Sequence, residues 1–232
     1  MQVFVDSANP QEISKWLRQG VVDGATTNPS IMFKDGVYDL EYGARELSAL
    51  LGELPLSVEV TINDPLEMLE QARELASWGE NIVVKIPIIN EWGASCLGVM
   101  HSLAAEGIKV NATAILSFNQ AILAAKAGAS YVSIFAGRIG DEGGDPATVI
   151  QNVRQWLDRW GYDSRIIAGS IRSVMDIQVA AVAGADIITI PPQLLSKMVD
   201  HRYTRETVHQ FIADAGNAMK QISKARVASA AD

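Results

Sequence analysis

The sequence contains almost no cysteine and few histidines, which limits the chemistry available to it. Cys96 is the single cysteine in 232 residues, so an intrachain disulfide and a cysteine-based metal site are both excluded. It falls in a segment of helical pattern, where we expect a small buried side chain rather than a nucleophile. The three histidines, His101, His201 and His209, fall in or near helical segments away from strand ends. We therefore expect no metal, no cofactor and no histidine acid–base pair.

Positive charge is also scarce, because 19 basic residues face 27 acidic ones and the formal net charge is −8. A nucleic acid or an anionic membrane surface is therefore not expected as the main partner. No apolar run approaches the ~18 residues of a membrane span, and the start of the chain reaches Asp6 without the basic region of a signal peptide. These absences predict a cytoplasmic protein in which any anionic ligand needs a local basic pocket.

Short apolar runs alternate with longer amphipathic segments along most of the chain. Ile13, Trp16 and Leu17 show the helical spacing, and Asn9-Pro10 and Asp145-Pro146 each place a capping residue before a proline. The expected strands are 2–6, 22–26, 56–61, 81–86, 108–113, 130–135, 165–169 and 186–190. Eight strand–helix units predict an α/β protein with a single (β/α)8 TIM barrel. An open doubly wound sheet is the alternative, although no G-x-G-x-x-G follows a strand.

A further helix is expected after the eighth unit, over about 204–227. Val208, Phe211, Ile212 and Met219 lie on one face of it. We treat residues 1–232 as one barrel domain with this additional C-terminal helix. Its apolar face covers either its own barrel or a neighbouring subunit.

Lys85 is the most informative single residue, because it stands among β-branched and aliphatic residues at the end of a predicted strand. Removal from water disfavours the ammonium form, and a neutral amine can form a Schiff base with a carbonyl substrate. The plainer interpretation is a structural lysine paired with a carboxylate, for which Glu59 is a candidate. In that case Glu59 would favour the charged form of Lys85.

Polar residues recur at the ends of the other predicted strands, where the active site of a barrel lies. Alternation places Ser57, Glu59 and Thr61 on one face of their strand and apolar residues on the other. The complete set of candidates is Asp6, Thr26, Asn28, Glu59, Lys85, Asn111, Thr113, Ser133, Phe135, Arg138, Ser170 and Arg172. A solvated rim of capping and turn residues is the alternative for this set.

These residues stand in motifs that together resemble the transaldolase family. The motifs are Asp6-Ser7-Ala8, Thr26-Thr27-Asn28-Pro29-Ser30, Val58-Glu59-Val60, Lys85-Ile86-Pro87, Asn111-Ala112-Thr113, Ser133 to Arg138 and Ser170-Ile171-Arg172. One of them alone is weak evidence, whereas seven in register on seven strands are specific. The short chain is similar to the compact subfamily, which contains transaldolases and fructose-6-phosphate aldolases on a class I aldolase-type barrel.

The resemblance implies roles for the candidates. Lys85, Asp6, Glu59 and Thr113 would be catalytic, with Lys85 as the Schiff-base lysine, Asp6 as proton acceptor, and Glu59 and Thr113 holding a water. The substrate-binding set would be Asn28, Thr26, Asn111, Ser133, Phe135, Arg138, Ser170 and Arg172. Sugar phosphates would be the partners, and the reaction would transfer a dihydroxyacetone unit from a ketose phosphate to an aldose phosphate.

Two positions distinguish the close relatives within this resemblance. The aldolases usually carry glutamine in place of Glu59 and tyrosine in place of Phe135, so this chain is expected to be a transaldolase. A fructose-6-phosphate aldolase, a non-catalytic phosphosugar-binding barrel and another Schiff-base aldolase remain alternatives. The compact relatives also imply a homo-oligomer, a pentamer or a decamer.

Overall fold

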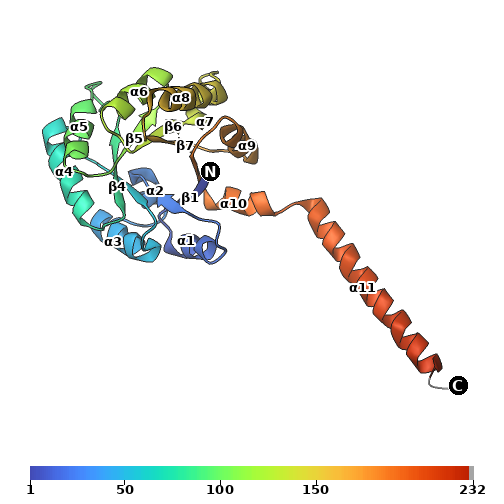
Figure 1. The fold of residues 1–232 in the computed structure, drawn as a ribbon. Coiled ribbons are helices and arrows are strands. Elements are labelled where there is room, and N and C mark those ends of the chain that lie inside the picture. Colours follow the sequence, from blue (N-terminus) through green and yellow to red (C-terminus); the bar gives the residue numbers. More distant parts are fainter. Residues whose placement is uncertain (230–232) are drawn as a thin grey trace. The chain divides into compact units, whose positions relative to one another are not determined.

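The computed structural model describes residues 1–229, and its centre is a closed barrel of parallel strands in the order β1 to β8 (Figure 1). The strands are β1 (Gln2–Asp6), β2 (Gly24–Thr26), β3 (Leu56–Glu59), β4 (Ile82–Pro87), β5 (Val110–Ile115), β6 (Tyr131–Phe135), β7 (Arg165–Gly169) and β8 (Ile187–Ile190). The first strand pairs with both the second and the eighth, which closes the sheet. The predicted (β/α)8 barrel is confirmed, and the open sheet is excluded.

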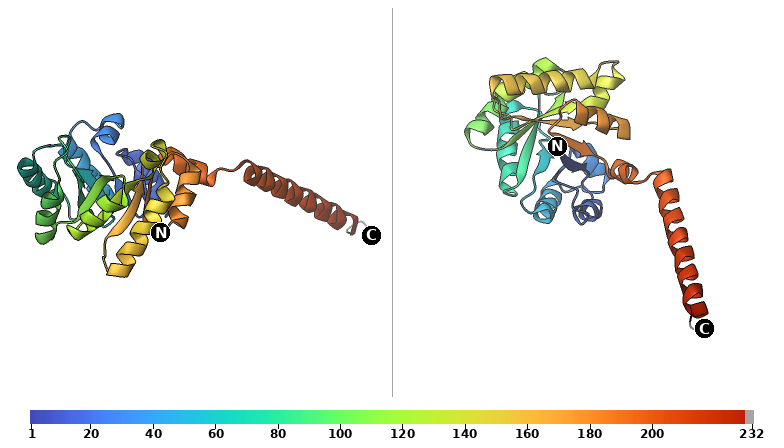
Figure 2. Two further views of the ribbon diagram at one scale, coloured as in Figure 1. Left: turned by 90° about the horizontal axis from the view of Figure 1, so that it is seen from above. Right: turned by 45° about the vertical axis from the view of Figure 1, so that its right-hand side comes forward.

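Helices surround the barrel on its outer side, as the further views in Figure 2 also show. They are α1 (Pro10–Leu17), α3 (Leu40–Leu51), α4 (Pro65–Ser77), α5 (Leu97–Ala105), α6 (Phe118–Lys126), α8 (Pro146–Trp160) and α9 (Val174–Val182). The side chains of Asn9, Asp64 and Asp145 accept hydrogen bonds from the first turns of α1, α4 and α8. The predicted cap–proline starts are therefore present.

Two short helices were not predicted, and both follow strands at the mouth of the barrel. They are α2 (Pro29–Lys34) and α7 (Ala136–Asp141). Six residues are too few to show a helical period in the sequence. Cys96 also differs slightly from expectation, because it stands at the N-cap of α5 rather than inside a helix, but it is fully buried as predicted.

The strand boundaries differ from prediction by one or two residues at several ends. The second strand begins at Gly24 rather than 22, and the fifth runs over Val110–Ile115 rather than 108–113. The fifth strand also contains a register shift between Ala112 and Ile115, with Ala114 in the left-handed region at φ 57°. This irregularity changes which face the residues beside it present.

The barrel interior has an apolar layer beneath a polar one. Phe4, Ile167 and Ile187 form a fully buried cluster against which Tyr131 packs. Gly24 gives the Phe4 ring its space, because a Cβ there would lie 2.8 Å from the ring. Since alternate residues share a face, Asp6 stands one interior position above Phe4, towards the carboxyl ends of the strands. The apolar layer closes the barrel below the site.

The chain divides into two compact units, Met1–Leu194 and Leu195–Asp232. The second contains most of α10 (Pro192–Val199) and the long α11 (Arg202–Ser229), close to the predicted 204–227. Within α11, Phe211, Ile212 and Met219 are 66%, 68% and 70% exposed. Among residues 1–229, no helix combines the length and apolar character needed to cross a membrane.

Candidate active site

A cavity of about 160 Å³ opens at the carboxyl ends of the strands. Its lining residues are Asp6, Thr26, Asn28, Lys85, Thr113, Ser133, Phe135, Arg138, Gly169, Ser170 and Thr189. The structure therefore brings together most of the residues expected from the sequence. The three expected residues that do not line this cavity are Glu59, Asn111 and Arg172.

Lys85 is buried at the floor of this cavity, with 5% of its surface exposed. Its Nζ donates to the carbonyl oxygen of Thr27 at 2.8 Å and lies 3.1 Å from Oε2 of Glu59. Strand register explains the ion pair, since Glu59 and Lys85 are partners on β3 and β4. The carboxylate is therefore in direct contact with the amine that lines the cavity.

Asp6 stands at the end of β1 in the same cavity. Protein atoms surround its carboxyl group, and this burial raises its pKa above the usual 3.8. The hydrogen bond from Thr26 and the charge of Lys85 oppose the rise in pKa, whereas Asp35 and Glu59 add to it. A carboxyl group with a raised pKa is suited to exchange protons with a substrate.

Thr26 contacts Asp6 rather than standing free to meet a ligand. Its Oγ1 donates to Oδ1 of Asp6 at 2.7 Å and also contacts Oγ1 of Thr189 on β8. Sequence reasoning missed Thr189, although alternation within the eighth strand places it on the interior face with Ile187. That alternation was the available signal.

A chain of polar side chains crosses the barrel beside the cavity. Ser133 Oγ donates to Oδ1 of Asn111 at 2.6 Å, and Nδ2 of Asn111 donates to Oγ of Ser57 at 3.0 Å. Asn111 is fully buried, and these two bonds use one donor and one acceptor site of its amide group. The arrangement fixes Ser133 at the cavity wall from β6. Ser57 lies on the strand face that alternation assigned to it, although it was not among the candidate site residues.

Among the candidates in the described part of the chain, Thr113 is the one whose buried hydroxyl group lacks a protein partner. Its Oγ1 is buried and forms no hydrogen bond with any other group in the described chain. The neighbouring Ala114 has φ 57°, and this bulge turns the end of β5 so that Thr113 lines the cavity. A buried polar atom without a partner costs stability, and such atoms mark sites where a ligand or water binds.

Asn28 caps a helix and also presents a polar group to the cavity. Its Oδ1 accepts from the backbone of Ile31 at 2.8 Å and thereby caps α2. Asn28 also lines the cavity. The capping bond uses its carbonyl oxygen, and its amide nitrogen remains available as a donor.

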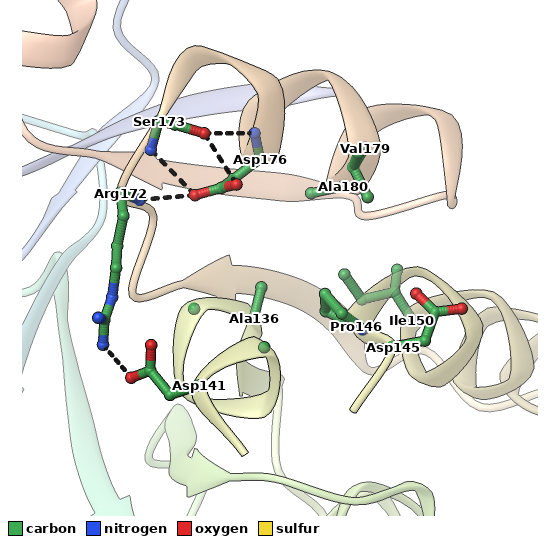
Figure 3. Close-up of a pocket in the computed structure, with 12 residues that line it drawn as sticks. Ala136, Asp141, Asp145, Pro146, Ile150, Arg172, Ser173, Asp176, Val179 and Ala180 are labelled. Carbon is green, nitrogen blue, oxygen red and sulfur yellow. Dashed lines mark hydrogen bonds and ion pairs between the residues drawn. The ribbon is translucent and has the colours of Figure 1, made fainter. Parts of the chain in front are cut away.

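Arg138 and Arg172, the two arginines of the expected substrate-binding set, are placed differently. Arg138 on α7 and Ser170 after β7 line the cavity, and Ser170 has φ 58°, a strained conformation for serine. Arg172 instead lines a neighbouring cavity of about 470 Å³ between α7, α8 and α9. Its Nη2 lies 2.5 Å from Oδ2 of Asp141 (Figure 3).

Gly137 lies beneath this strained segment. A Cβ built on it would lie 2.0 Å from the carbonyl oxygen of Ser170 and 2.9 Å from Nε of Arg172. Only glycine therefore allows α7 and the loop after β7 to approach so closely. At the end of the same loop, Ser173 forms a capping box with Asp176 in the first turn of α9 and so fixes the start of that helix (Figure 3).

The described residues hold no group of three or more histidine, cysteine, aspartate or glutamate side chains arranged for a metal ion. The chemistry that the site offers is a buried amine, a paired carboxylate, a second carboxyl group of raised pKa and one guanidinium at the rim. This set is suited to Schiff-base formation and proton transfer on an anionic carbonyl compound.

Comparison with known sequences agrees with this geometry. Residues 3–231 match the family described as Transaldolase/Fructose-6-phosphate aldolase. The chain belongs to this family. A probable transaldolase of Dehalococcoides mccartyi is 41% identical over 95% of the chain and 100% of its own length. Probable transaldolases of Lactiplantibacillus plantarum and Listeria monocytogenes are also 41% identical, over 92% of the chain and 96% and 95% of their own lengths.

Among solved structures, the similarity reaches beyond this family. A mandelate oxidase bound to 2-hydroxy-phenylacetamide superimposes with a TM-score of 0.56 at 16% identity, over 82% of the chain. The chain spans 64% of the oxidase's length. At this identity the likeness concerns the barrel fold alone. The family resemblance expected from the strand-end motifs is thus confirmed, and the protein is a member of an enzyme family.

Proposed function

We propose that this member of the transaldolase/fructose-6-phosphate aldolase family is a transaldolase. It would transfer a dihydroxyacetone unit from sedoheptulose 7-phosphate to glyceraldehyde 3-phosphate, giving erythrose 4-phosphate and fructose 6-phosphate. The observation that carries the proposal is the buried Lys85 amine, which lies 3.1 Å from Glu59 in a cavity that also contains Asp6. A solvated rim of capping residues would not require a lysine in this environment.

The first step would form the Schiff base. Glu59 accepts a proton from Lys85, and the neutral Nζ attacks the C2 carbonyl of the ketose to form a carbinolamine. Loss of water from the carbinolamine needs proton delivery to the departing hydroxyl group. Glu59 and the unpartnered hydroxyl of Thr113 would hold the water that shuttles these protons.

The second step would break the C3–C4 bond. Asp6 takes the proton from the C4 hydroxyl group, and the bond's electron pair passes into the iminium, which becomes an enamine on Lys85. The aldose phosphate leaves as an aldehyde. A second aldehyde then accepts the enamine carbon, Asp6 returns the proton to the new hydroxyl group, and hydrolysis of the iminium releases the product ketose.

Substrate contacts would divide between the two ends of the cavity. Asn28 and Ser133 would bind hydroxyl groups of the dihydroxyacetone unit. The hydrogen bond from Ser133 to Asn111 holds Ser133 in place. Arg138 and Ser170 would bind the distal phosphate, where a guanidinium matches the phosphate oxygens. Arg172 would join them after leaving Asp141.

Two residues favour transfer over release of free dihydroxyacetone. Glu59 and Phe135 stand where the similar aldolases usually carry glutamine and tyrosine. The Phe135 ring forms part of the cavity wall and offers no proton to the enamine. An enamine that is not protonated persists until an acceptor aldehyde arrives, which is the condition for group transfer. A fructose-6-phosphate aldolase is the second candidate function.

Borohydride trapping tests the proposal directly. Reduction in the presence of fructose 6-phosphate should leave a three-carbon adduct on Lys85, identified by intact mass and peptide mapping. Lys85→Ala is the matched variant and should yield no adduct while retaining its fold by circular dichroism. Absence of an adduct on any lysine of the folded parent would contradict both the transaldolase and the aldolase, and would leave a phosphosugar-binding barrel. Product analysis with and without erythrose 4-phosphate then distinguishes transfer from release.

The quaternary structure is also part of the proposal. Phe211, Ile212 and Met219 are mostly exposed on α11, and a second copy of the chain would cover them in a pentamer or decamer. Truncation after Tyr203 should lower the particle mass in solution, and an unchanged mass would exclude this role. The single cysteine suits a reducing compartment, so we place the enzyme in the cytoplasm.

A further inference from the structure

We propose that Thr189 is a positioning residue. Acting through Thr26, it orients and strengthens the hydrogen bond that Asp6 receives. This inference rests on the proposed function of Asp6 as the group that exchanges a proton with the substrate. Its basis is a continuous contact from β8 through β2 to β1: Thr189 Oγ1 meets Thr26 Oγ1, which donates to Asp6 Oδ1 at 2.7 Å.

The direction of these hydrogen bonds follows from the number of protons that the hydroxyl groups carry. A threonine hydroxyl group has one proton to donate and two lone pairs that accept. An ionised Asp6 only accepts, so the single proton of Thr26 is committed to Oδ1. The contact between the two threonines therefore requires Thr189 to be the donor. The chain runs from Thr189 to Thr26 to Asp6 while the carboxylate is ionised.

The two threonines of this hydrogen-bond chain are buried. Thr26 is 2% exposed and Thr189 is 5% exposed. In the sheet, Thr189 on β8 is paired with Phe4 on β1. A hydroxyl group that itself accepts a hydrogen bond becomes a stronger donor, because the bonds polarise one another. Thr189 thus strengthens the bond that stabilises the ionised carboxylate, although it does not touch Asp6.

The same chain also fits the protonated state. When Asp6 takes the substrate proton, its carboxyl group can donate to Thr26 Oγ1, the Thr26 proton turns towards Thr189 Oγ1, and the proton of Thr189 leaves its bond to Thr26 and turns away from it. Rotation of the two hydroxyl groups reverses the direction without movement of heavy atoms. Both protonation states of Asp6 are therefore supported by one set of positions, and this suits a group that must accept and then return a proton in each cycle.

Several charged groups face Asp6 and set the background for this effect. Lys85 on β4 lowers the pKa of Asp6, whereas Glu59 on β3 and Asp35 at the end of α2 raise it, as does burial. None of these groups forms part of the threonine chain. Replacing Thr189 by the isosteric valine removes the donor to Thr26 and leaves each of these charges in place.

The experiment measures the titration of the Asp6 carboxyl carbon by 13C NMR in the full-length protein with labelled aspartate, the signal being assigned by its loss in Asp6→Asn. In Thr189→Val the midpoint should rise by about half a pH unit. On the acid limb of kcat/KM for fructose 6-phosphate, the same shift corresponds to a fall of about threefold. Thr189→Ser keeps the hydroxyl group and should return both midpoints to the parental values.

The outcomes separate the two levels of the proposal. An Asp6 midpoint that is the same in Thr189→Val and the parent refutes the threonine chain, whatever happens to activity. A shift in the NMR midpoint without a shift in the acid limb supports the chain and contradicts the role of Asp6 as proton acceptor. A midpoint in Thr189→Ser that follows the valine variant would show that packing by the threonine, rather than its hydroxyl group, is responsible.

Discussion

Gly137→Ala offers the sharpest test of how the phosphate end of the site is built. Gly137 lies in α7, directly against the segment that contains Ser170 and Arg172. A Cβ at this position would stand 2.0 Å from the carbonyl oxygen of Ser170, where real Cβ contacts are essentially never closer than 3.0 Å. The neighbour is backbone rather than the end of a flexible side chain, so the loop after β7 has to move.

The magnitude follows from this overlap. Relief of the contact needs a displacement of about 1 Å, and misplacement of a binding group by that distance can cost up to ~100-fold in rate. We expect kcat/KM for fructose 6-phosphate to fall by about 10-fold to 100-fold. The effect on unphosphorylated fructose should be smaller, because the displaced groups are those assigned to the phosphate.

Gly140→Ala is the matched control on the same helix. Nothing lies within 4 Å of a Cβ at Gly140, so this variant adds the same methyl group without a contact. Both substitutions replace glycine by alanine and should favour the helical conformation by up to about 1 kcal/mol. Because this effect is the same in both variants, a change in helix stability cannot explain a difference between them.

The assay is the ratio of kcat/KM for fructose 6-phosphate to that for fructose, measured in the parent and both variants. The reasoning predicts a reduced ratio in Gly137→Ala and a parental ratio in Gly140→Ala. Equal ratios in all three proteins, with Gly137→Ala folded, would show that the position of the Ser170 loop does not control phosphate binding.

Three further predictions concern other parts of the site. Phe135→Tyr should increase release of free dihydroxyacetone relative to transfer, measured by product analysis without an acceptor; an unchanged ratio would remove Phe135 from the account. Because burial raises the pKa of Asp6 above 3.8, ionising it costs stability as pH rises from 3.8 through that raised pKa. Asp6→Asn should therefore lose activity, and its Tm should rise relative to that of the parent as pH increases through this window. A difference in Tm that does not change with pH would contradict the raised pKa of Asp6. Asp141→Asn removes the charge that lies 2.5 Å from Arg172. Because an exposed ion pair contributes at most about 1 kcal/mol, its loss should lower KM for fructose 6-phosphate by up to about fivefold. A higher KM would show that Asp141 positions Arg172 for the phosphate.

The alternation of residues along the strands explains why the structure brings most of the candidate residues to one cavity. Asp6, Lys85 and Ser133 line the cavity because a strand with one face towards the helices must turn its alternate residues inwards. The same rule made Glu59 a neighbour of Lys85 once the third and fourth strands paired. The cap–proline signals at Asn9 and Asp145 fixed helix starts for a reason that is local to the chain.

The sequence by itself therefore determined the barrel, the polar mouth and the lysine at its floor, because these depend on local pattern and on a fixed strand period. Only the tertiary structure decided which polar groups meet. Thr189 reaches Thr26 because the eighth strand closes against the first, and Arg172 meets Asp141 because α7 and the loop after β7 approach across Gly137. Such contacts join residues distant in the chain, and their partners are set by barrel closure and close packing rather than by neighbours in sequence.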